Sequence, residues 1–573
     1  MNQKRWRRDI LLSVLVPGAL LLLGLLTVRF SYEVNDDTAM ISIMNGSFTG
    51  TPSPYAIFVK YPLSWLISLF YRTGLAISWY QVIMFAIMWL AMGSVLYRLL
   101  QRLPEHPVLA SLMVTGSVSV LWMTNIMRFT FSTCGAFVAA SALICFSLQK
   151  KEEDLRPAYL VNIILLYVLS YLIRDYFCYV ATCFLGVIWL AKYGREMFAN
   201  RKCWRIPVAA LLCMAIAMGI NSAAYHRDNW DWFIDYNNAR SNLQDFLGFP
   251  DYDDHKQFIN ELGYDRQEYY AISHYDYCLL EDFSPEDLFP LSDYADELMP
   301  EVGLKKTVKT TVKRAIDYFF VDSLEDLKPL QLASYLLPPA LLMMAVICSL
   351  RDKKWYILPT GLLLFGLGAI WLYIALEGRY PLRVASTMRI ITIAASLSGI
   401  AHIWVARLEE GRQSKKQANS LAIGLLCGLF ALCALLGLYN ARNELGAPLS
   451  QEVQPAEYVS YVTEHPENIY LRDTRSVSSS SALLSEFPRT PVNMVATGSW
   501  TAYSPIFYEK LETLGLDGLN RETLYLDNCY LIVHQKHALS KVLGVSGEAV
   551  IEAEVVEAFD DGMQIWKIHS ITE

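Results

Sequence analysis

The sequence predicts an α-helical polytopic membrane protein of about eleven transmembrane helices, with a small C-terminal α/β domain outside the membrane. The composition is the first observation, because 54% of the 573 residues are hydrophobic and only 18% are charged. The second observation is that several windows contain about 17–25 apolar residues, which is the length of a membrane-spanning helix. The third is that basic residues recur in every second loop, as expected of loops that face the cytoplasm.

The first span follows a basic N-terminus, "MNQKRWRRD", which places that end in the cytoplasm. No small-residue cleavage site follows, so we expect an uncleaved helix over 10–29. The remaining apolar windows alternate in direction through the membrane and keep the basic loops inside. The further predicted spans are 77–97, 108–125, 131–148, 158–173, 176–192, 205–222, 330–350, 355–376, 384–405 and 419–438.

The segment 61–74, "YPLSWLISLFYRTG", is apolar but too short to cross the membrane comfortably. We expect it to form a helix at the outer surface. Counting it as a span would place Arg98 and Arg102 outside and invert every later loop.

These spans divide the chain into four parts. An N-terminal membrane module, 1–222, contains the first outer loop, 30–76. A large extracytoplasmic loop, 223–328, is rich in Asp, Glu and Tyr, and its length favours an ordered, functional segment. Further transmembrane helices occupy 329–439.

The C-terminal part, 440–573, is predicted to be an extracytoplasmic α/β domain with an accessory role. "AEYVSYVTEHP" has a helical pattern, whereas "ENIYLRD", "TLYLDNCYLIVHQ" and "AVIEAEVVEAFDDGMQIWKI" have the alternation or β-branched content of strands. About 130 residues suffice for one such domain. It shows no nucleotide-binding glycine loop and no Ser-His-Asp signature.

Charge and cysteine content exclude several classes of function. A net charge of −8 argues against nucleic-acid binding, which requires basic patches. Most cysteines lie inside apolar spans and are interpreted as small hydrophobic residues, and none has zinc-site spacing. Cys278 and Cys529 lie in polar regions outside the spans, so a disulfide between them is left open.

Two adjacent acids, Asp36 and Asp37, follow the first span in "YEVNDDTAMISIMNGSFTG". A simple structural explanation is that Asn35 caps a helix and the acids complement its dipole. Gly46 would then end that helix. Its predicted apolar face consists of Met40, Ile41, Ile43 and Met44. Capping needs only one of these polar side chains, however, so it does not account for the pair.

This block resembles the first outer loop of the GT-C membrane glycosyltransferases. That superfamily includes protein O-mannosyltransferases, the catalytic subunit of oligosaccharyltransferase and lipid A aminoarabinose transferases. The resemblance covers the basic N-terminus, span one, the acidic pair, the glycine- and proline-rich turns and a surface helix beginning at Tyr61-Pro62. The number of spans, the enlarged outer loop and the outer C-terminal domain also fit.

The resemblance implies that a sugar moves from a polyprenyl-linked donor to an extracytoplasmic glycan, lipid or protein, in the setting of a bacterial cell envelope. It implies that Asp36, or alternatively Asp37, activates or positions the acceptor. A carboxylate can take the proton of an acceptor hydroxyl or stabilise charge at the anomeric carbon. Because neighbouring acids repel each other, one of the two can have a raised pKa.

The leaving phosphate requires cations near the membrane surface. We expect them among the basic residues at the outer ends of spans and in the outer loops, and Arg240 is also a candidate for binding the sugar or acceptor. The predicted cations are Arg379, Arg383, Arg174, Lys60, Arg128 and Arg240. The alternative for an arginine at a span end is snorkelling to lipid headgroups. Arg379 and Arg383 are favoured because outer arginines run against the positive-inside trend.

No metal-binding residues are predicted, and a divalent cation is left open as a cofactor. Some GT-C proteins use a divalent cation, but no Asp/His spacing in this sequence demands one. A transporter or flippase for a lipid-linked glycan is an alternative function. It is disfavoured because the span centres are almost free of charge and the two halves show no repeat. A non-catalytic protein of cell-envelope assembly is left open.

Overall fold

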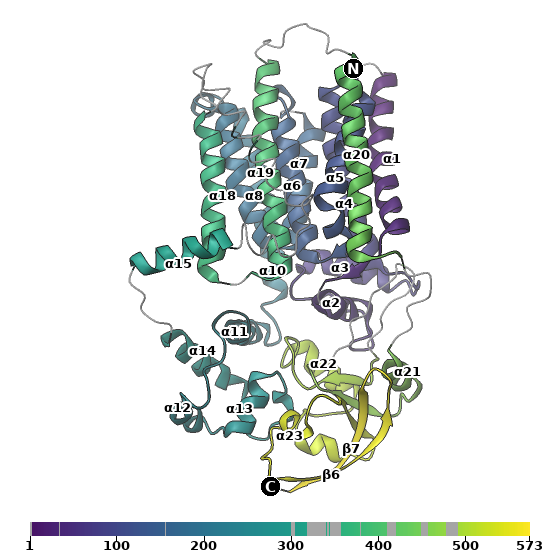
Figure 1. Cartoon of the computed structure of the whole chain (residues 1–573), viewed down its shortest axis with the longest axis vertical. Helices are drawn as coiled ribbons and strands as arrows, with labels where there is room; N and C mark the ends of the chain where they lie inside the picture. The colour runs from purple at the N-terminus through teal and green to yellow at the C-terminus, as the bar shows by residue number, and fades with distance from the viewer. Residues whose placement is uncertain are drawn as a thin grey trace.

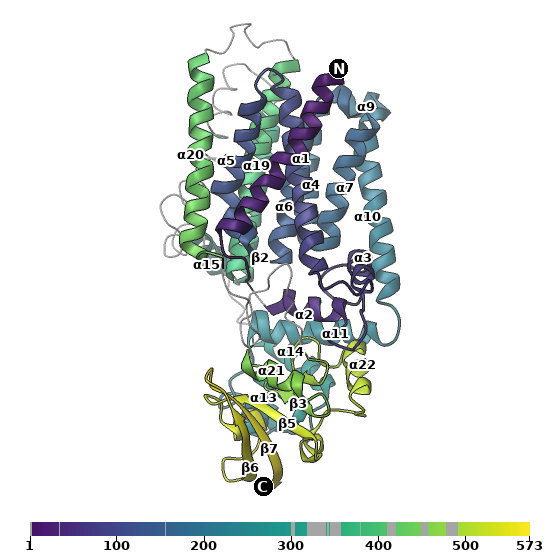
Figure 2. The same ribbon diagram turned by 90° about the vertical axis from the view of Figure 1, so that its right-hand side faces the viewer.

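The computed structural model describes residues 3–33, 35–154, 156–298, 304–317, 340, 343, 357–378, 380–409, 420–448, 456–476 and 491–572. Long helices form one bundle, and most of the remaining elements gather at one end of it (Figure 1). We call this the domain end. The N-terminus lies at the opposite end of the bundle, and the C-terminus lies in the part farthest from it (Figures 1 and 2).

Eight helices in the described residues are long and apolar enough to cross a membrane. They are α1 (Gln3–Thr27), α4 (Trp79–Arg102), α5 (Pro107–Met127), α6 (Phe131–Leu148), α8 (Asp175–Tyr193), α10 (Arg205–Ala224), α19 (Leu382–Glu409) and α20 (Ser420–Leu445). Two shorter apolar helices accompany them, α7 (Pro157–Ile173) and α18 (Ile357–Glu377). Each predicted span in the described part of the chain coincides with one of these helices. The predicted span 330–350 lies outside the described residues.

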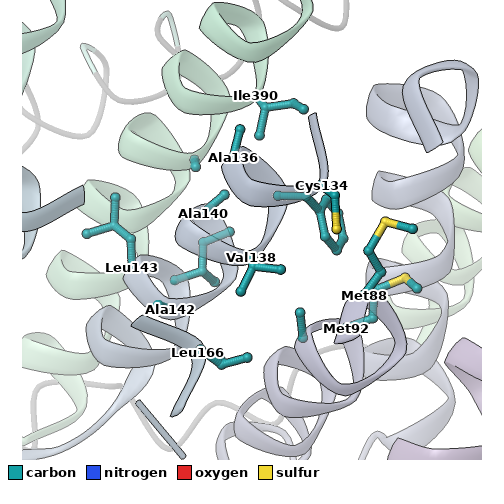
Figure 3. Packing of buried hydrophobic residues seen from close by; sticks show 14 of the residues in the cluster. Met88, Met92, Cys134, Ala136, Val138, Ala140, Ala142, Leu143, Leu166 and Ile390 are labelled. Atoms are coloured by element: carbon teal, nitrogen blue, oxygen red, sulfur yellow. The ribbon is translucent and has the colours of Figure 1, made fainter. Parts of the chain in front are cut away.

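Helix α6 forms the centre of the bundle, and all of its residues are buried. It packs against α4, α7, α8 and α19. Figure 3 shows small side chains such as Ala136 and Ala140 of α6 surrounded by larger ones, including Met88 and Ile390. Small residues allow helix backbones to approach closely where no hydrophobic effect drives association. This packing fixes the position of the α6 N-terminus at the domain end.

Two short helices lie across the domain end of the bundle, α2 (Asn35–Asn45) and α3 (Tyr61–Tyr71) (Figure 2). Helix α3 confirms the predicted surface helix, and Pro62 occupies its first turn, where a missing N–H costs nothing. Its exposed residues are Trp65, Leu66, Leu69 and Phe70. An exposed apolar face at this level suits the boundary of lipid and water.

The C-terminal residues form the predicted α/β domain. Its strands are β3 (Ile469–Arg472), β4 (Met494–Ala496), β5 (Cys529–His534), β6 (Val550–Ala558) and β7 (Met563–Thr572). The strand order is β4-β3-β5-β7-β6, with β4, β3 and β5 parallel and the last two antiparallel. Its helices are α21 (Glu457–Glu464), α22 (Pro505–Thr513) and α23 (Leu539–Val542). The sequence analysis did not predict β4, because three residues are too few to show an alternating pattern.

The large loop is mainly helical. Its helices are α11 (Trp230–Ser241), α12 (Lys256–Glu261), α13 (Arg266–Ser273), α14 (Leu288–Glu297) and α15 (Leu304–Ile316). The short helix α9 (Glu196–Ala199) is not part of this loop and lies between α8 and α10 in the chain. Buried residues of the large loop and of the C-terminal domain belong to one hydrophobic cluster, which includes Tyr236 and Leu531. We call this cluster the domain core. Cys278 and Cys529 are both buried in it as free thiols.

Helix α2 lies between the domain core and the bundle. The sequence analysis assigned four of its residues to a single apolar face. In the structure Met40, Ile41 and Met44 belong to the core of the bundle, whereas Ile43 belongs to the domain core. Because α2 is packed from both sides, its first turn is held where the membrane helices meet the two soluble regions.

Candidate functional site

The turn that follows α2 requires a glycine. Gly46 ends the helix, as predicted, and has φ +87°. A Cβ atom added to Gly46 would lie 2.7 Å from the backbone nitrogen of Pro52. Only glycine adopts this conformation without strain and allows so close an approach of the backbone. The turn directs the chain back toward the bundle and fixes the C-terminal end of α2.

Asp37 is fully buried and joins three helices. Its Oδ1 atom accepts hydrogen bonds from Tyr80 Oη at 2.6 Å and from the Phe131 backbone N–H at 3.1 Å. Tyr80 belongs to α4, and Phe131 is the first residue of α6, whose N-cap is Thr130. Burial raises the pKa of Asp37 well above its usual value, and the charge of Asp36 raises it further. Asp37 is therefore held as a buried hydrogen-bond acceptor.

Asp36 points to a different environment. Its side chain is 19% exposed, and its Oδ2 atom lies 3.9 Å from Nη1 of Arg383. Burial raises the pKa of Asp36, while the positive charges of Arg383 and Arg174 oppose that rise. The adjacent acids are thus divided: Asp36 is the accessible carboxylate and Asp37 is the enclosed one.

Glu33 is a third carboxylate at this site, and the sequence analysis missed it. Strand β1 (Ser31–Tyr32) pairs in parallel with β2 (Arg128–Phe129), and Glu33 N–H donates to Phe129 O at 3.1 Å. Burial raises the pKa of Glu33, and the positive charges of Arg128 and Arg383 oppose this rise. Its position in "YEVNDD", three residues before Asp36, was the signal that could have identified it.

Arg174 lies between α7 and α8, surrounded by aromatic rings. Its guanidinium carbon is 5.2 Å from the ring centre of Phe131, 5.8 Å from that of Phe58 and 4.8 Å from that of Tyr176. Rings at these distances stabilise a cation. A Cβ atom on Gly135 would lie 3.1 Å from Cβ of Arg174, so a glycine in α6 makes room for it.

Arg240 reaches the site from the large loop. Its Nε donates to Asn237 Oδ1 at 3.0 Å and its Nη1 donates to Tyr275 Oη at 3.3 Å. The side chain is almost wholly buried, yet its charge lowers the pKa of Asp36. Asp245, which no local pattern indicated, acts on Asp36 in the opposite direction.

The other predicted cations have carboxylate neighbours or fall outside the described residues. Nη2 of Arg128 lies 3.4 Å from Oε1 of Glu444 in α20, and Nζ of Lys60 lies 2.9 Å from Oδ2 of Asp175. A role for these two in binding phosphate stays a prediction. Arg379 lies outside the described residues.

The site combines a partly exposed carboxylate with arginines from distant parts of the chain. Such a set can bind an anion and accept a proton from a neighbouring hydroxyl. Within the part of the chain that the structure describes, no group of three or more His, Cys, Asp or Glu side chains is arranged to hold a metal ion.

Neither a family model nor a curated protein matches the sequence. Solved structures similar to the chain include ArnT from Cupriavidus metallidurans bound to undecaprenyl phosphate, with 12% identity, a TM-score of 0.47 and 98% of each chain covered. Another is the archaeal oligosaccharyltransferase AglB from Archaeoglobus fulgidus in complex with an inhibitory peptide and a dolichol-phosphate. The identity is 13% and the TM-score 0.40, over 93% of this chain and 70% of AglB.

The arabinofuranosyltransferase AftD from Mycobacteria is similar over 97% of this chain and 40% of its own, at 10% identity and a TM-score of 0.36.

Proposed function

We propose that the protein is a membrane glycosyltransferase that moves a sugar from a polyprenyl-linked donor to an acceptor at the domain end of the bundle. The observation that carries this proposal is the position of Asp36, whose carboxylate lies 3.9 Å from Arg383 and is influenced by Arg174 and Arg240. These residues come from an outer loop, two membrane-helix ends and the large loop, and they meet between the bundle and the domain core.

The arginines at the helix ends suit the phosphate of a lipid-linked donor. Arg383 lies in the first turn of α19 and Arg174 directly precedes α8. Both therefore stand where an apolar helix ends, a position that suits contact with a lipid headgroup. A planar guanidinium presents paired donors to phosphate oxygens and stays charged when partly buried. The same cations would stabilise the negative charge of the leaving phosphate.

Asp36 is the proposed proton acceptor. In the transfer, the bond between the anomeric carbon and the donor phosphate oxygen breaks, and a bond to the acceptor oxygen forms. The acceptor proton passes to the Asp36 carboxylate, and the phosphate retains the bonding electrons. Burial raises the pKa of Asp36 and makes it a better base, while Arg383 and Arg174 keep it ionised.

Asp37 is proposed to position its neighbour. Its hydrogen bonds to Tyr80 and to the backbone of Phe131 fix the first turn of α2 against α4 and α6. Because Asp36 is directly adjacent in the chain, this attachment of Asp37 sets the direction of the Asp36 carboxylate.

The test compares Asp36→Asn with Asp293→Asn, which removes an exposed carboxylate of α14 and serves as the matched control. Both variants are expressed in cells that lack the native protein, their membrane levels are measured, and the surface glycan is analysed. We expect Asp36→Asn to abolish the glycan product and Asp293→Asn to restore it fully. A normal glycan with Asp36→Asn at native membrane levels would overturn the proposal and favour transport or assembly.

A further inference from the structure

An aromatic side chain of the C-terminal domain reaches the candidate site. Trp500 lies between β4 and α22, and its ring centre is 4.8 Å from that of Phe58 in the first outer loop, with 57° between the ring planes. Both side chains are partly exposed. Trp500 packs against the core of the bundle as well as the domain core. The two rings therefore meet where the domain, the first outer loop and the membrane helices come together.

The backbone beside both rings is strained. Ser499, directly before Trp500, has φ +94°, and Ile57, directly before Phe58, has φ +65°. Positive φ is uncommon for residues other than glycine, and a β-branched residue such as isoleucine is a clear outlier. Strain of this kind persists only when the surrounding structure enforces it, and it gathers at functional sites. Two strained positions far apart in the sequence thus direct the two rings that touch.

The loop that carries Trp500 is held firmly. Tyr277 Oη donates a hydrogen bond to Ser499 O at 3.0 Å, and Ser504 Oγ donates to Thr501 O at 2.6 Å. A Cβ atom on Gly498 would lie 1.5 Å from Tyr275 O, so the loop is pressed against the large loop. A ring fixed in this way binds a flat ligand surface without losing further conformational freedom.

Phe58 and Trp500 lie next to the charged residues of the site. Phe58 stacks on Phe131 with ring centres 5.8 Å apart and planes at 13°, and the backbone of Phe131 holds Asp37. Phe58 also lies beside the guanidinium of Arg174. A ligand that covers Phe58 and Trp500 would therefore be placed next to both the carboxylates and the arginines.

We infer that Phe58 and Trp500 form a platform that binds a sugar ring of the acceptor, so that the acceptor is a glycan and the C-terminal domain helps to select it. This inference rests on the proposed function. The C–H face of a sugar ring carries partial positive charge and suits the negative face of an aromatic ring. The acceptor is assigned here rather than the donor, because Trp500 enters from the domain and the donor phosphate is assigned to arginines at the membrane-helix ends.

The test measures binding of glycan isolated from cells that lack this protein, with the purified full-length protein in lipid nanodiscs. We expect Trp500→Ala to weaken glycan binding about tenfold and Trp500→Phe to weaken it less, since a smaller ring retains part of the contact. Tyr508→Ala is the matched control, because Tyr508 is an exposed aromatic residue of α22 in the same domain. It should bind the glycan as the unaltered protein does.

Kinetics separate glycan binding from a merely structural role of Trp500. Trp500→Ala should raise KM for the glycan with little change in kcat, and should leave polyprenyl-phosphate binding unchanged. Asp36→Asn should bind the glycan normally and transfer the sugar about 10²–10⁴-fold more slowly, so failure of the proposed function would leave the binding result interpretable.

Unchanged glycan affinity in Trp500→Ala, or no glycan binding by the unaltered protein, overturns the inference. Where Trp500→Ala fails to fold, Trp500→Phe and Phe58→Leu decide it by the same measurement.

Discussion

The Oδ2 atom of Asp36, in the first turn of α2, lies 3.9 Å from Nη1 of Arg383, in the first turn of α19. This distance is longer than a hydrogen bond, so the two charges attract without occupying each other's hydrogen-bonding positions. A carboxylate and a guanidinium related in this way can each turn to a substrate group while stabilising the other.

Replacing Asp36 with Asn should reduce kcat by about 10²–10⁴-fold, the usual contribution of a general base. The amide is nearly isosteric but cannot accept the acceptor proton. Folding should be unaffected, because the side chain is partly exposed and its ion pair is long. Transfer rates measured with purified protein check the first part, and thermal unfolding in detergent checks the second. A variant with near-normal kcat would remove Asp36 from the chemistry.

Asp37 should respond differently to two substitutions. Asp37→Asn keeps an oxygen that accepts from Tyr80 and Phe131, so we expect a folded protein of near-native stability. Asp37→Ala leaves both buried donors without that acceptor and should cost about 1–3 kcal/mol for each unsatisfied group. Thermal midpoints of the two variants, measured side by side, test this. Equal midpoints would show that the hydrogen bonds contribute little.

Arg383→Ala should weaken binding of polyprenyl phosphate by about 1.5–3 kcal/mol, the contribution of hydrogen bonds to charged groups. Arg383→Lys should retain part of the affinity for polyprenyl phosphate, because an ammonium keeps the charge but not the paired donors. Arg156→Ala is a suitable control, since Arg156 is exposed and lies at the opposite end of α7 from Arg174. The affinity of each variant for polyprenyl phosphate is measured in nanodiscs. Equal affinities for all three variants would contradict a phosphate site at Arg383.

Gly46→Ala should destabilise the protein more than Gly50→Ala. Both glycines have positive φ, +87° and +85°, so alanine strains the backbone by about 1–2 kcal/mol at either position. Only at Gly46 would the new Cβ also meet backbone atoms at 2.7 Å, whereas at Gly50 its nearest neighbour is a side-chain atom of Thr513 at 4.0 Å. The difference between their thermal midpoints isolates the clash. Equal losses would mean that the turn after α2 can shift.

Lys510 should make stability depend on pH. It is buried in α22, donates to Val492 O, lies 5.4 Å from the ring centre of Phe48, and burial lowers its pKa to about 7. Its pKa in the unfolded chain is about 10.4, so the folded protein binds this proton less tightly. Stability should therefore rise as the pH increases from about 7 to about 10, by at most about 1.4 kcal/mol per pH unit.

The variant Lys510→Met removes this titrating group and should remove that rise. Lys536→Met, at an exposed position, should retain it. Thermal midpoints between pH 6.5 and 9.5 provide the comparison. Parallel curves for the unaltered protein and Lys510→Met would show that this lysine is not the cause.

Local patterns in the sequence predicted the apolar helices of the bundle, the short helix α3 and most strands of the C-terminal domain. The length of an apolar window predicts a span because the bilayer has a fixed thickness, and α1, α4 and α19 appear where such windows lie. The shortness of 61–74 predicted the surface helix α3, and alternation or β-branched content predicted β3, β5, β6 and β7. The pair Asp36 and Asp37 also stood out, because two acids beside a span are expensive and need a reason.

The composition of the site was decided only by the tertiary structure. Nothing near Asp36 or Asp37 in the chain indicates which one faces Arg383 and which one is enclosed by Tyr80 and Phe131. The approach of Trp500 to Phe58 likewise follows from tertiary packing, since both rings pack against the core of the bundle. Charge, burial and ring contacts depend on distances between residues far apart in sequence. Local pattern sets the type of each element, but packing sets which side chains meet.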